Sequence, residues 1–183
     1  MRSLIAILML AIGMAVTVSA QKMDDPMVGG AAMYKTKNIV ENAVNSKDHT
    51  TLVAAVKAAG LVDTLEGAGP FTVFAPTNEA FNKLPAGTVD TLLMAENKAT
   101  LTKVLTYHVV AGNYDSKAIA KAIKDGHGKA EFSTVEGGKL WAMMDGKNLI
   151  LTDEKGGRSM VTIADVRQSN GVIHVVDTVL MPN

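Results

Sequence analysis

The chain has 183 residues, 48% hydrophobic and 20% charged, which is an ordinary composition for a globular domain with one buried core. Basic and acidic residues number 18 each, and no basic stretch is interleaved with aromatic residues, so the composition argues against nucleic-acid binding. The sequence contains no cysteine, which excludes a disulfide framework and a lipid-modified cysteine. Packing of the core must therefore hold the fold together.

Residues 1–20 have the features of a secretory signal peptide. Arg2 supplies a positive start, Leu4 to Val18 is almost continuously apolar, and the run ends in Ser19-Ala20, small residues that signal peptidase accepts. The apolar run is shorter than the roughly 20 residues that span a bilayer, so a membrane anchor is the weaker alternative. We expect cleavage after Ala20, giving a secreted or periplasmic protein that is not an integral membrane protein.

Residues 21–34 have the composition of a flexible linker, with one proline and a Gly29-Gly30 pair, and the domain is expected over 35–183. Apolar residues then recur at helical spacing over 39–44 and 52–56. Gly60 stands where a helix C-cap glycine belongs.

The central third predicts a buried strand followed by helices. The apolar run 71–75 is a strand closed by Pro76, and Thr77 caps the helical turn that follows it. Helices are expected over 88–94, 98–106 and 116–124, and a short strand over 107–110.

The last third is predicted to be strands, over 130–135, 139–144, 148–152, 159–166 and 171–180. Glycine-containing pairs typical of hairpin turns separate them: Gly137-Gly138, Asp145-Gly146, Gly156-Gly157 and Asn170-Gly171. Helices first and strands later indicate an α+β fold.

Three segments carry a family resemblance, namely Thr72 to Phe81, Tyr107-His108-Val109-Val110, and Asn170 to Pro182. In this order and spacing they resemble the two homology boxes and the intervening Tyr-His motif of the fasciclin domain family, in its secreted bacterial single-domain type. The resemblance runs from Tyr34 to Pro182. It implies a β-sandwich or wedge of about seven strands, with several flanking helices in the N-terminal half.

The resemblance also implies which residues maintain the structure. These motif positions are Phe74, Pro76, Thr77, Asn78, Phe81, Asn170, Gly171, His174 and Asp177. Because both boxes are too apolar to face water on more than one side, we expect Phe74, Phe81, Ile173 and Val175 to be buried.

Tyr107 and His108 are the first candidate partner-binding pair. In animal fasciclin domains the matching segment is implicated in integrin recognition. The structural alternative makes His108 a buried neutral imidazole that hydrogen-bonds to Thr77 or Asn78, because buried polar groups are normally satisfied internally.

Asp165 and Val166 are the second candidate pair. An Asp-Ile at the matching place in animal relatives is proposed as an integrin contact, and this chain has Asp-Val. The structural alternative is a strand-end aspartate that makes a turn hydrogen bond. The sequence contains no Arg-Gly-Asp to strengthen the integrin interpretation.

Nothing in the sequence predicts catalysis. The four histidines, His49, His108, His127 and His174, lack the spacing that pairs metal ligands on a helix, so we expect no metal and no cofactor. No nucleophile elbow or phosphate-binding loop is present.

The resemblance predicts a monomeric, non-enzymatic adhesion or cell-surface and extracellular-matrix interaction module. Its partner is expected to be a surface or matrix protein or a polysaccharide. The alternative is a secreted binding protein for a lipophilic small molecule such as a carotenoid, because the chain is rich in methionine and poor in aromatic residues.

Overall fold

The computed structural model describes residues 25–183, so the predicted signal peptide lies outside the described residues. The helices in this range are α1 (Ile39–Ala43), α2 (Thr50–Ala59), α3 (Val62–Glu66), α4 (Asn78–Asn82), α5 (Thr88–Leu93), α6 (Lys98–Tyr107) and α7 (Ser116–Asp125), with 3₁₀ turns η1 (Lys47–His49) and η2 (Ala95–Asn97). The strands are β1 (Met27–Val28), β2 (Ala31–Ala32), β3 (Phe71–Pro76), β4 (Val109–Ala111), β5 (Ala130–Ser133), β6 (Lys139–Asp145), β7 (Asn148–Thr152), β8 (Arg158–Gln168) and β9 (Gly171–Val176).

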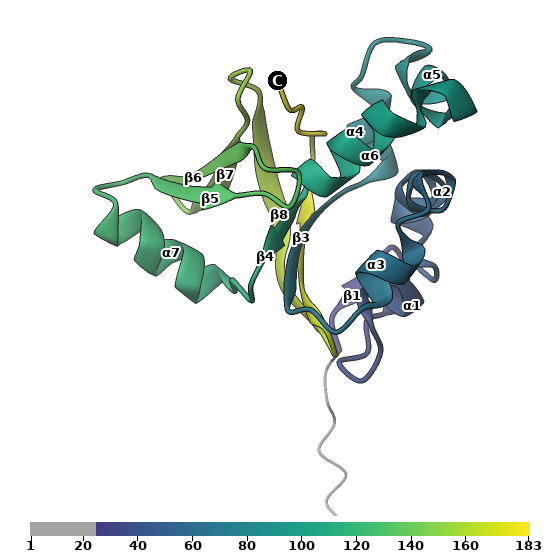
Figure 1. Ribbon diagram of the computed structural model, residues 1–183. Coiled ribbons are helices and arrows are strands. Elements are labelled where there is room, and N and C mark those ends of the chain that lie inside the picture. The colour runs from purple at the N-terminus through teal and green to yellow at the C-terminus, as the bar shows by residue number, and fades with distance from the viewer. Residues whose placement is uncertain (1–24) are drawn as a thin grey trace, which may run out of the picture.

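Seven of the described strands form one sheet, in the order β4-β3-β9-β8-β7-β6-β5. The two homology boxes supply β3 and β9, the second and third strands in this order, which pair in parallel, and the other pairings are antiparallel. The two ends of the sheet meet, because the Val135 N–H donates to the Val109 carbonyl at 2.7 Å. The sheet is therefore curled almost into a barrel, and the predicted α+β fold is confirmed (Figure 1).

Helices cover the sheet on two sides. Figure 1 shows α1, α2, α3 and α6 on one side of β3, and α7 beside β5 and β6 on the other. Alternating side chains of β3 point to two separate cores: Val73 and Ala75 into the helical one, Phe74 into the one inside the curled sheet. The predicted burial of Phe74, Phe81, Ile173 and Val175 is confirmed.

Two helix boundaries follow the capping residues that the sequence indicates. Gly60 ends α2 in the left-handed conformation, at φ 73°. The Thr77 hydroxyl caps α4 by accepting the Ala80 N–H at 3.2 Å. Both predictions are confirmed.

The predicted strand over 107–110 is partly wrong. Tyr107 is the last residue of α6, and His108 continues the helical conformation at φ −82° and ψ 0°. Only β4, from Val109, is extended. Leu101, Val104 and Leu105 are buried on one face of α6, and their helical packing outweighs the β preference of the valines that follow.

The described part of the predicted linker is also ordered. β1 and β2 form a hairpin, in which Val28 and Met33 are 4% and 2% exposed and belong to the helical core. The glycine pair makes the turn between the two strands, and Gly29 lies so close to Ser46 that a Cβ would be 2.3 Å from its hydroxyl. The glycine composition therefore indicates a tight, packed turn here and not a linker.

Candidate functional site

Tyr107 lies at the centre of the sheet core. Its side chain is completely buried, and its hydroxyl donates to the Lys139 carbonyl and accepts the Glu154 N–H at 3.1 Å. Burial raises the pKa of the Tyr107 hydroxyl to about 12. This residue thus joins α6 to the β6–β7 region from within.

His108 is also satisfied inside the fold. Its Nδ1 donates to the Val104 carbonyl at 2.8 Å, and its Nε2 accepts the Leu180 N–H at 3.0 Å. These partners fix the neutral imidazole, and burial lowers its pKa to about 4. The prediction that His108 bonds to Thr77 or Asn78 is wrong. Thr77 caps α4, and the Asn78 side chain accepts the Thr51 N–H of α2.

Asp165 and Val166 differ in environment. Val166 is 1% exposed, whereas Asp165 is half-buried within β8, at a bulge between Ile163 and Val166, with φ 61°. Its carboxylate accepts the Ser116 N–H at 2.6 Å and the Ser116 hydroxyl. The expected strand-end turn is therefore wrong: Asp165 lies inside a strand and holds the first residue of α7.

The second homology box connects distant parts of the chain. Asn170 accepts the Ile39 N–H at 3.1 Å and donates to the Leu65 and Gly67 carbonyls at 2.7 and 2.9 Å. Gly171 does not have positive φ, but a Cβ there would lie 2.1 Å from the Phe71 carbonyl oxygen. Close approach of β3 thus explains this glycine.

His174 and Asp177 have comparable structural contacts. His174 is buried, stacks on Phe74 and donates from Nε2 to the Tyr114 carbonyl at 2.8 Å. Burial lowers the pKa of His174 below its usual value. Asp177 accepts the Met160 N–H at 2.8 Å. Pro76 ends β3 and, like Phe81, is buried.

An open recess of about 520 Å³ lies beside Asp165. We call it the α7 recess; the residues used here from its lining are Ser116, Lys117, Met144, Lys147, Thr162 and Ala164. Met144 is 44% exposed, and both lysines are exposed. Ser116 and Ala164 border it next to the strained bulge, so the position of Asp165 determines the shape of its rim.

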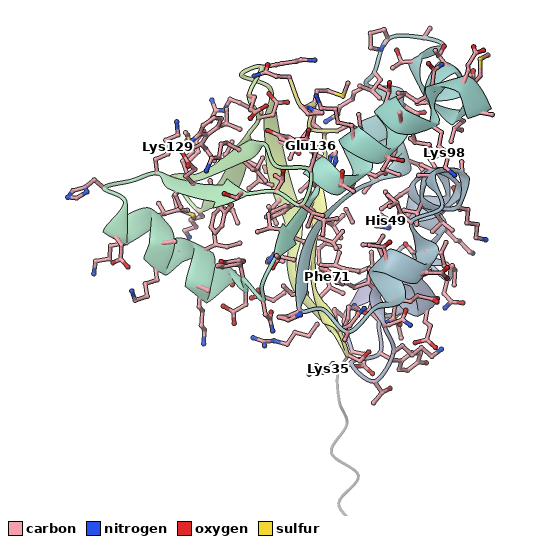
Figure 2. The ribbon with its side chains drawn as sticks, in the orientation of Figure 1. Lys35, His49, Phe71, Lys98, Lys129 and Glu136 are labelled. Carbon is pink, nitrogen blue, oxygen red and sulfur yellow. The ribbon has the colours of Figure 1, made fainter. Side chains whose placement is uncertain are left out.

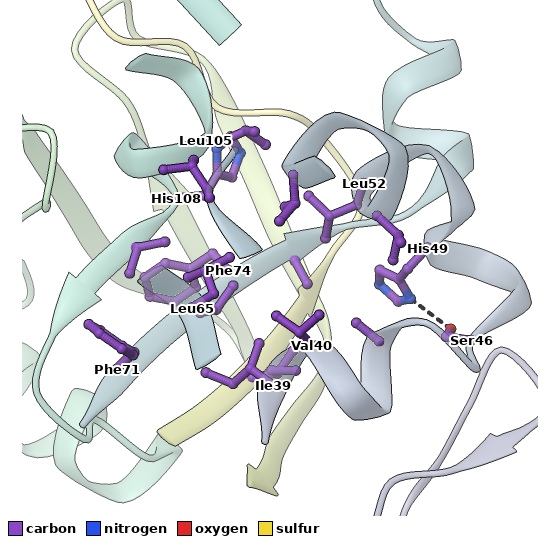
Figure 3. Close-up of a pocket in the computed structure, with 18 of the residues that line it drawn as sticks. Ile39, Val40, Ser46, His49, Leu52, Leu65, Phe71, Phe74, Leu105 and His108 are labelled. Atoms are coloured by element: carbon purple, nitrogen blue, oxygen red, sulfur yellow. Dashed lines mark hydrogen bonds between the residues drawn. The ribbon is translucent and has the colours of Figure 1, made fainter. Parts of the chain in front are cut away.

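A second hollow, which we call the helical cavity, separates α1–α3 from the sheet. It has a volume of about 70 Å³, and its lining is almost entirely apolar, including Val40, Val56, Leu65, Val73 and Ile173 (Figure 3). This volume is far below the roughly 300–1,000 Å³ of pockets that hold drug-sized ligands, so it does not support the carotenoid alternative.

His49 is the buried polar residue that sequence reasoning did not single out. It is 3% exposed, on the helical side of the molecule, and lines the helical cavity (Figure 2). Nδ1 lies 2.8 Å from the Ser46 hydroxyl, but Nε2 has no hydrogen-bond partner among residues 25–183. Burial lowers the pKa of His49 and is the largest effect. The Ala75 carbonyl acts in the opposite direction, because it stabilises the protonated ring, but it does not meet hydrogen-bond geometry.

Within residues 25–183 no cluster of three or more His, Cys, Asp or Glu side chains is placed to hold a metal ion. Over the same stretch, none of the helices has the length and apolarity that crossing a bilayer requires.

Comparison with known proteins identifies the domain. The family model of the fasciclin domain matches residues 47–182. Protein sll1483 of Synechocystis is 46% identical over 94% of this chain and 90% of its own length. The immunogenic protein MPB70 of Mycobacterium bovis is 34% identical, over 92% of this chain and 89% of its own.

Two similar proteins are longer than this chain. Transforming growth factor-beta-induced protein ig-h3 of Sus scrofa is 39% identical over 72% of this chain, which spans 17% of that protein. The fold matches the FAS1 domain pair of the insect cell adhesion molecule fasciclin I, with a TM-score of 0.70 and 18% identity, over 79% of this chain and 51% of the pair. The resemblance seen in the sequence is therefore confirmed, and the chain belongs to the fasciclin domain family.

Proposed function

We propose that this protein is a non-enzymatic adhesion module that binds a cell-surface or matrix protein or a polysaccharide. Membership of the fasciclin domain family supports this proposal. The names of similar proteins agree with it, since MPB83 of Mycobacterium bovis is called a cell surface glycolipoprotein and the matching structure comes from a cell adhesion molecule. Cleavage after Ala20, export and a monomeric state belong to the same proposal.

The strained bulge at Asp165, beside the α7 recess, is the observation that supports this location for the binding site. A non-glycine residue with positive φ is uncommon, and such strain is found preferentially at functional sites. Here Asp165 lies directly after Ala164 and bonds to Ser116, and both of these residues line the recess together with exposed Met144, Lys117 and Lys147. Exposed apolar and basic groups around a concave surface can bury against a partner and pair with its charges.

The other three predicted partner-binding residues act from beneath in this proposal. Tyr107, His108 and Val166 are buried, so their contribution to adhesion is to hold the sheet that carries the recess. Val166 is adjacent to Asp165, and Tyr107 fixes the open end of the β6–β7 hairpin through Lys139 and Glu154, while the turn end of the same hairpin lines the recess.

The test is attachment of protein-coated beads to intact cells of the source organism and to their isolated envelope proteins and polysaccharides. Asp165→Asn removes the negative charge, while asparagine tolerates positive φ and keeps an acceptor for Ser116. Met144→Ser and Lys147→Glu alter the recess without touching the core. Lys98→Glu on α6, on the helical side of the molecule, is the matched charge control (Figure 2).

We expect Asp165→Asn and Lys147→Glu each to reduce attachment by about fivefold or more, the effect of losing a contact worth at least 1 kcal/mol. Lys98→Glu should attach like the parent. Melting curves are used to verify that every variant is folded at the assay temperature. Equal attachment by the recess variants and the parent would exclude the α7 recess, and absence of attachment by the parent would argue against adhesion.

A further inference from the structure

We propose that the helical cavity binds a small apolar molecule with a single oxygen acceptor, which receives a hydrogen bond from Nε2 of His49. This site lies on the opposite side of β3 from the core that contains Tyr107, and it is independent of the adhesion proposal.

The size and lining of the cavity define the chemical class of the ligand. An engineered apolar cavity of roughly 150 Å³ stays free of water and binds benzene. The helical cavity, at about 70 Å³, has half that volume, so it suits a molecule of about three to five heavy atoms. Its aliphatic lining favours a short hydrocarbon body and excludes charged or strongly polar molecules.

His49 supplies the polar contact. Among the described residues the Ser46 hydroxyl has one hydrogen-bond partner, the Nδ1 atom of His49 at 2.8 Å. We assign the hydroxyl as the donor to Nδ1, which gives the hydroxyl proton an acceptor and places the ring proton of the neutral imidazole on Nε2. That Nε2–H is buried, and it lacks a partner among residues 25–183 because the Ala75 carbonyl near the ring does not meet hydrogen-bond geometry. Buried donors are normally paired, so this one is available to a carbonyl, ether or hydroxyl oxygen.

His108 lines the same cavity but does not compete for this role. Both of its nitrogens are engaged, with the Val104 carbonyl and the Leu180 N–H. Water is a poor occupant, because a buried water molecule typically makes about three hydrogen bonds and this lining is almost entirely apolar. Exposed Lys57, Thr64 and Val135 also border the cavity, so it has a route to the surface.

Methyl and imidazole NMR of the full chain tests the site with two probes of equal shape. The first is 2-butanone, and the second is 2-methyl-1-butene, in which a CH₂ group replaces the ketone oxygen. We expect both probes to shift the methyl resonances of Val56, Leu105 and Ile173, which line the cavity. Only the ketone should shift the ¹⁵N resonance of His49 Nε2.

Variants separate the hydrogen bond from the cavity. In His49→Leu the preference for 2-butanone over the alkene should fall by about fivefold, the effect of losing one hydrogen bond. Ala43→Leu places a larger side chain at the cavity wall and should abolish binding of both probes. Ala58→Leu is the control, because Ala58 lies exposed on α2 outside the lining.

Methyl shifts confined to the cavity, together with the ¹⁵N response, support the proposal. If neither probe shifts the lining methyls up to its solubility limit, the cavity is not a binding site. If both bind but the unmodified His49 resonance does not respond to the ketone, the proposed hydrogen bond is wrong. That measurement needs no variant, so it decides the question even if His49→Leu fails to fold.

Discussion

Two buried histidines line the same cavity and differ in one respect. His49 and His108 are each 3% exposed, and burial lowers the pKa of both. Both nitrogens of His108 have backbone partners, whereas Nε2 of His49 has none among the described residues. Burial alone therefore does not distinguish these two histidines. Their hydrogen-bonding capacity does, and the proposed ligand site depends on this difference.

The largest expected effect on stability comes from the core inside the curled sheet, to which Phe74 belongs. Phe74→Ala should lower the free energy of unfolding by about 3–5 kcal/mol, because the ring is 1% exposed and its removal leaves a cavity. Denaturant unfolding at pH 7 measures this loss. A loss below 1 kcal/mol would mean that the sheet core repacks around the missing ring, and that it is packed no more tightly than the helical core on the other side of β3.

His108→Leu should cost about 1–3 kcal/mol. Leucine keeps most of the apolar volume, but the Leu180 N–H is left buried without its acceptor. Denaturant unfolding and hydrogen exchange at the Leu180 amide report the effect together. Unchanged exchange at this amide would show that another acceptor replaces the imidazole.

The histidines also predict how stability changes with pH. The folded-state pKa values of His49, His108 and His174 lie below the ordinary value of 6.5, so the unfolded chain binds protons more readily. Stability should be fully present above pH 6.5 and decrease as the pH falls below it, for His108 by roughly 1 kcal/mol per pH unit. For His108 the loss continues to about pH 4. Unfolding curves between pH 7 and 5 should show a shallower slope for His108→Leu, and an identical slope contradicts this assignment.

The smallest effect is expected where the hydrogen-bonding capacity is unused. His49→Leu combined with Ser46→Ala replaces both partners by apolar groups and removes a buried donor that lacks an acceptor. Such a replacement is nearly neutral or stabilising, so the change should be within about 1 kcal/mol of the parent. A loss as large as that of His108→Leu would mean that His49 is as structural as His108.

The local sequence pattern predicted much of the fold. The apolar boxes predicted the two strands that pair in parallel, and Gly60 and Thr77 marked helix boundaries that depend on a single residue. Tyr107 was misplaced because packing of α6 decides its conformation. The hairpin before α1 was missed because a two-residue strand has no periodicity, and its order depends on burial of Val28 and Met33 by distant residues.

The candidate sites were harder to predict for a related reason. The Ser46–His49 spacing is visible in the sequence, but an unpaired nitrogen is recognised only when all of its neighbours are known. The positive φ of Asp165 is likewise not visible in the sequence, because it accompanies the bulge in the pairing of β8 with β9 and the contact with Ser116. Both features depend on residues far apart in the chain.

The meeting of β4 and β5 has a consequence for colloidal behaviour. An open sheet presents unpaired amides and carbonyls along its outermost strands, and these can recruit strands from other molecules into aggregates. Here the outermost strands bond to each other, through Val135 to Val109 and the Val110–Thr134 bridge. Self-association by strand addition must first open this junction. A cysteine-free domain thus gains resistance to aggregation from the topology of its sheet.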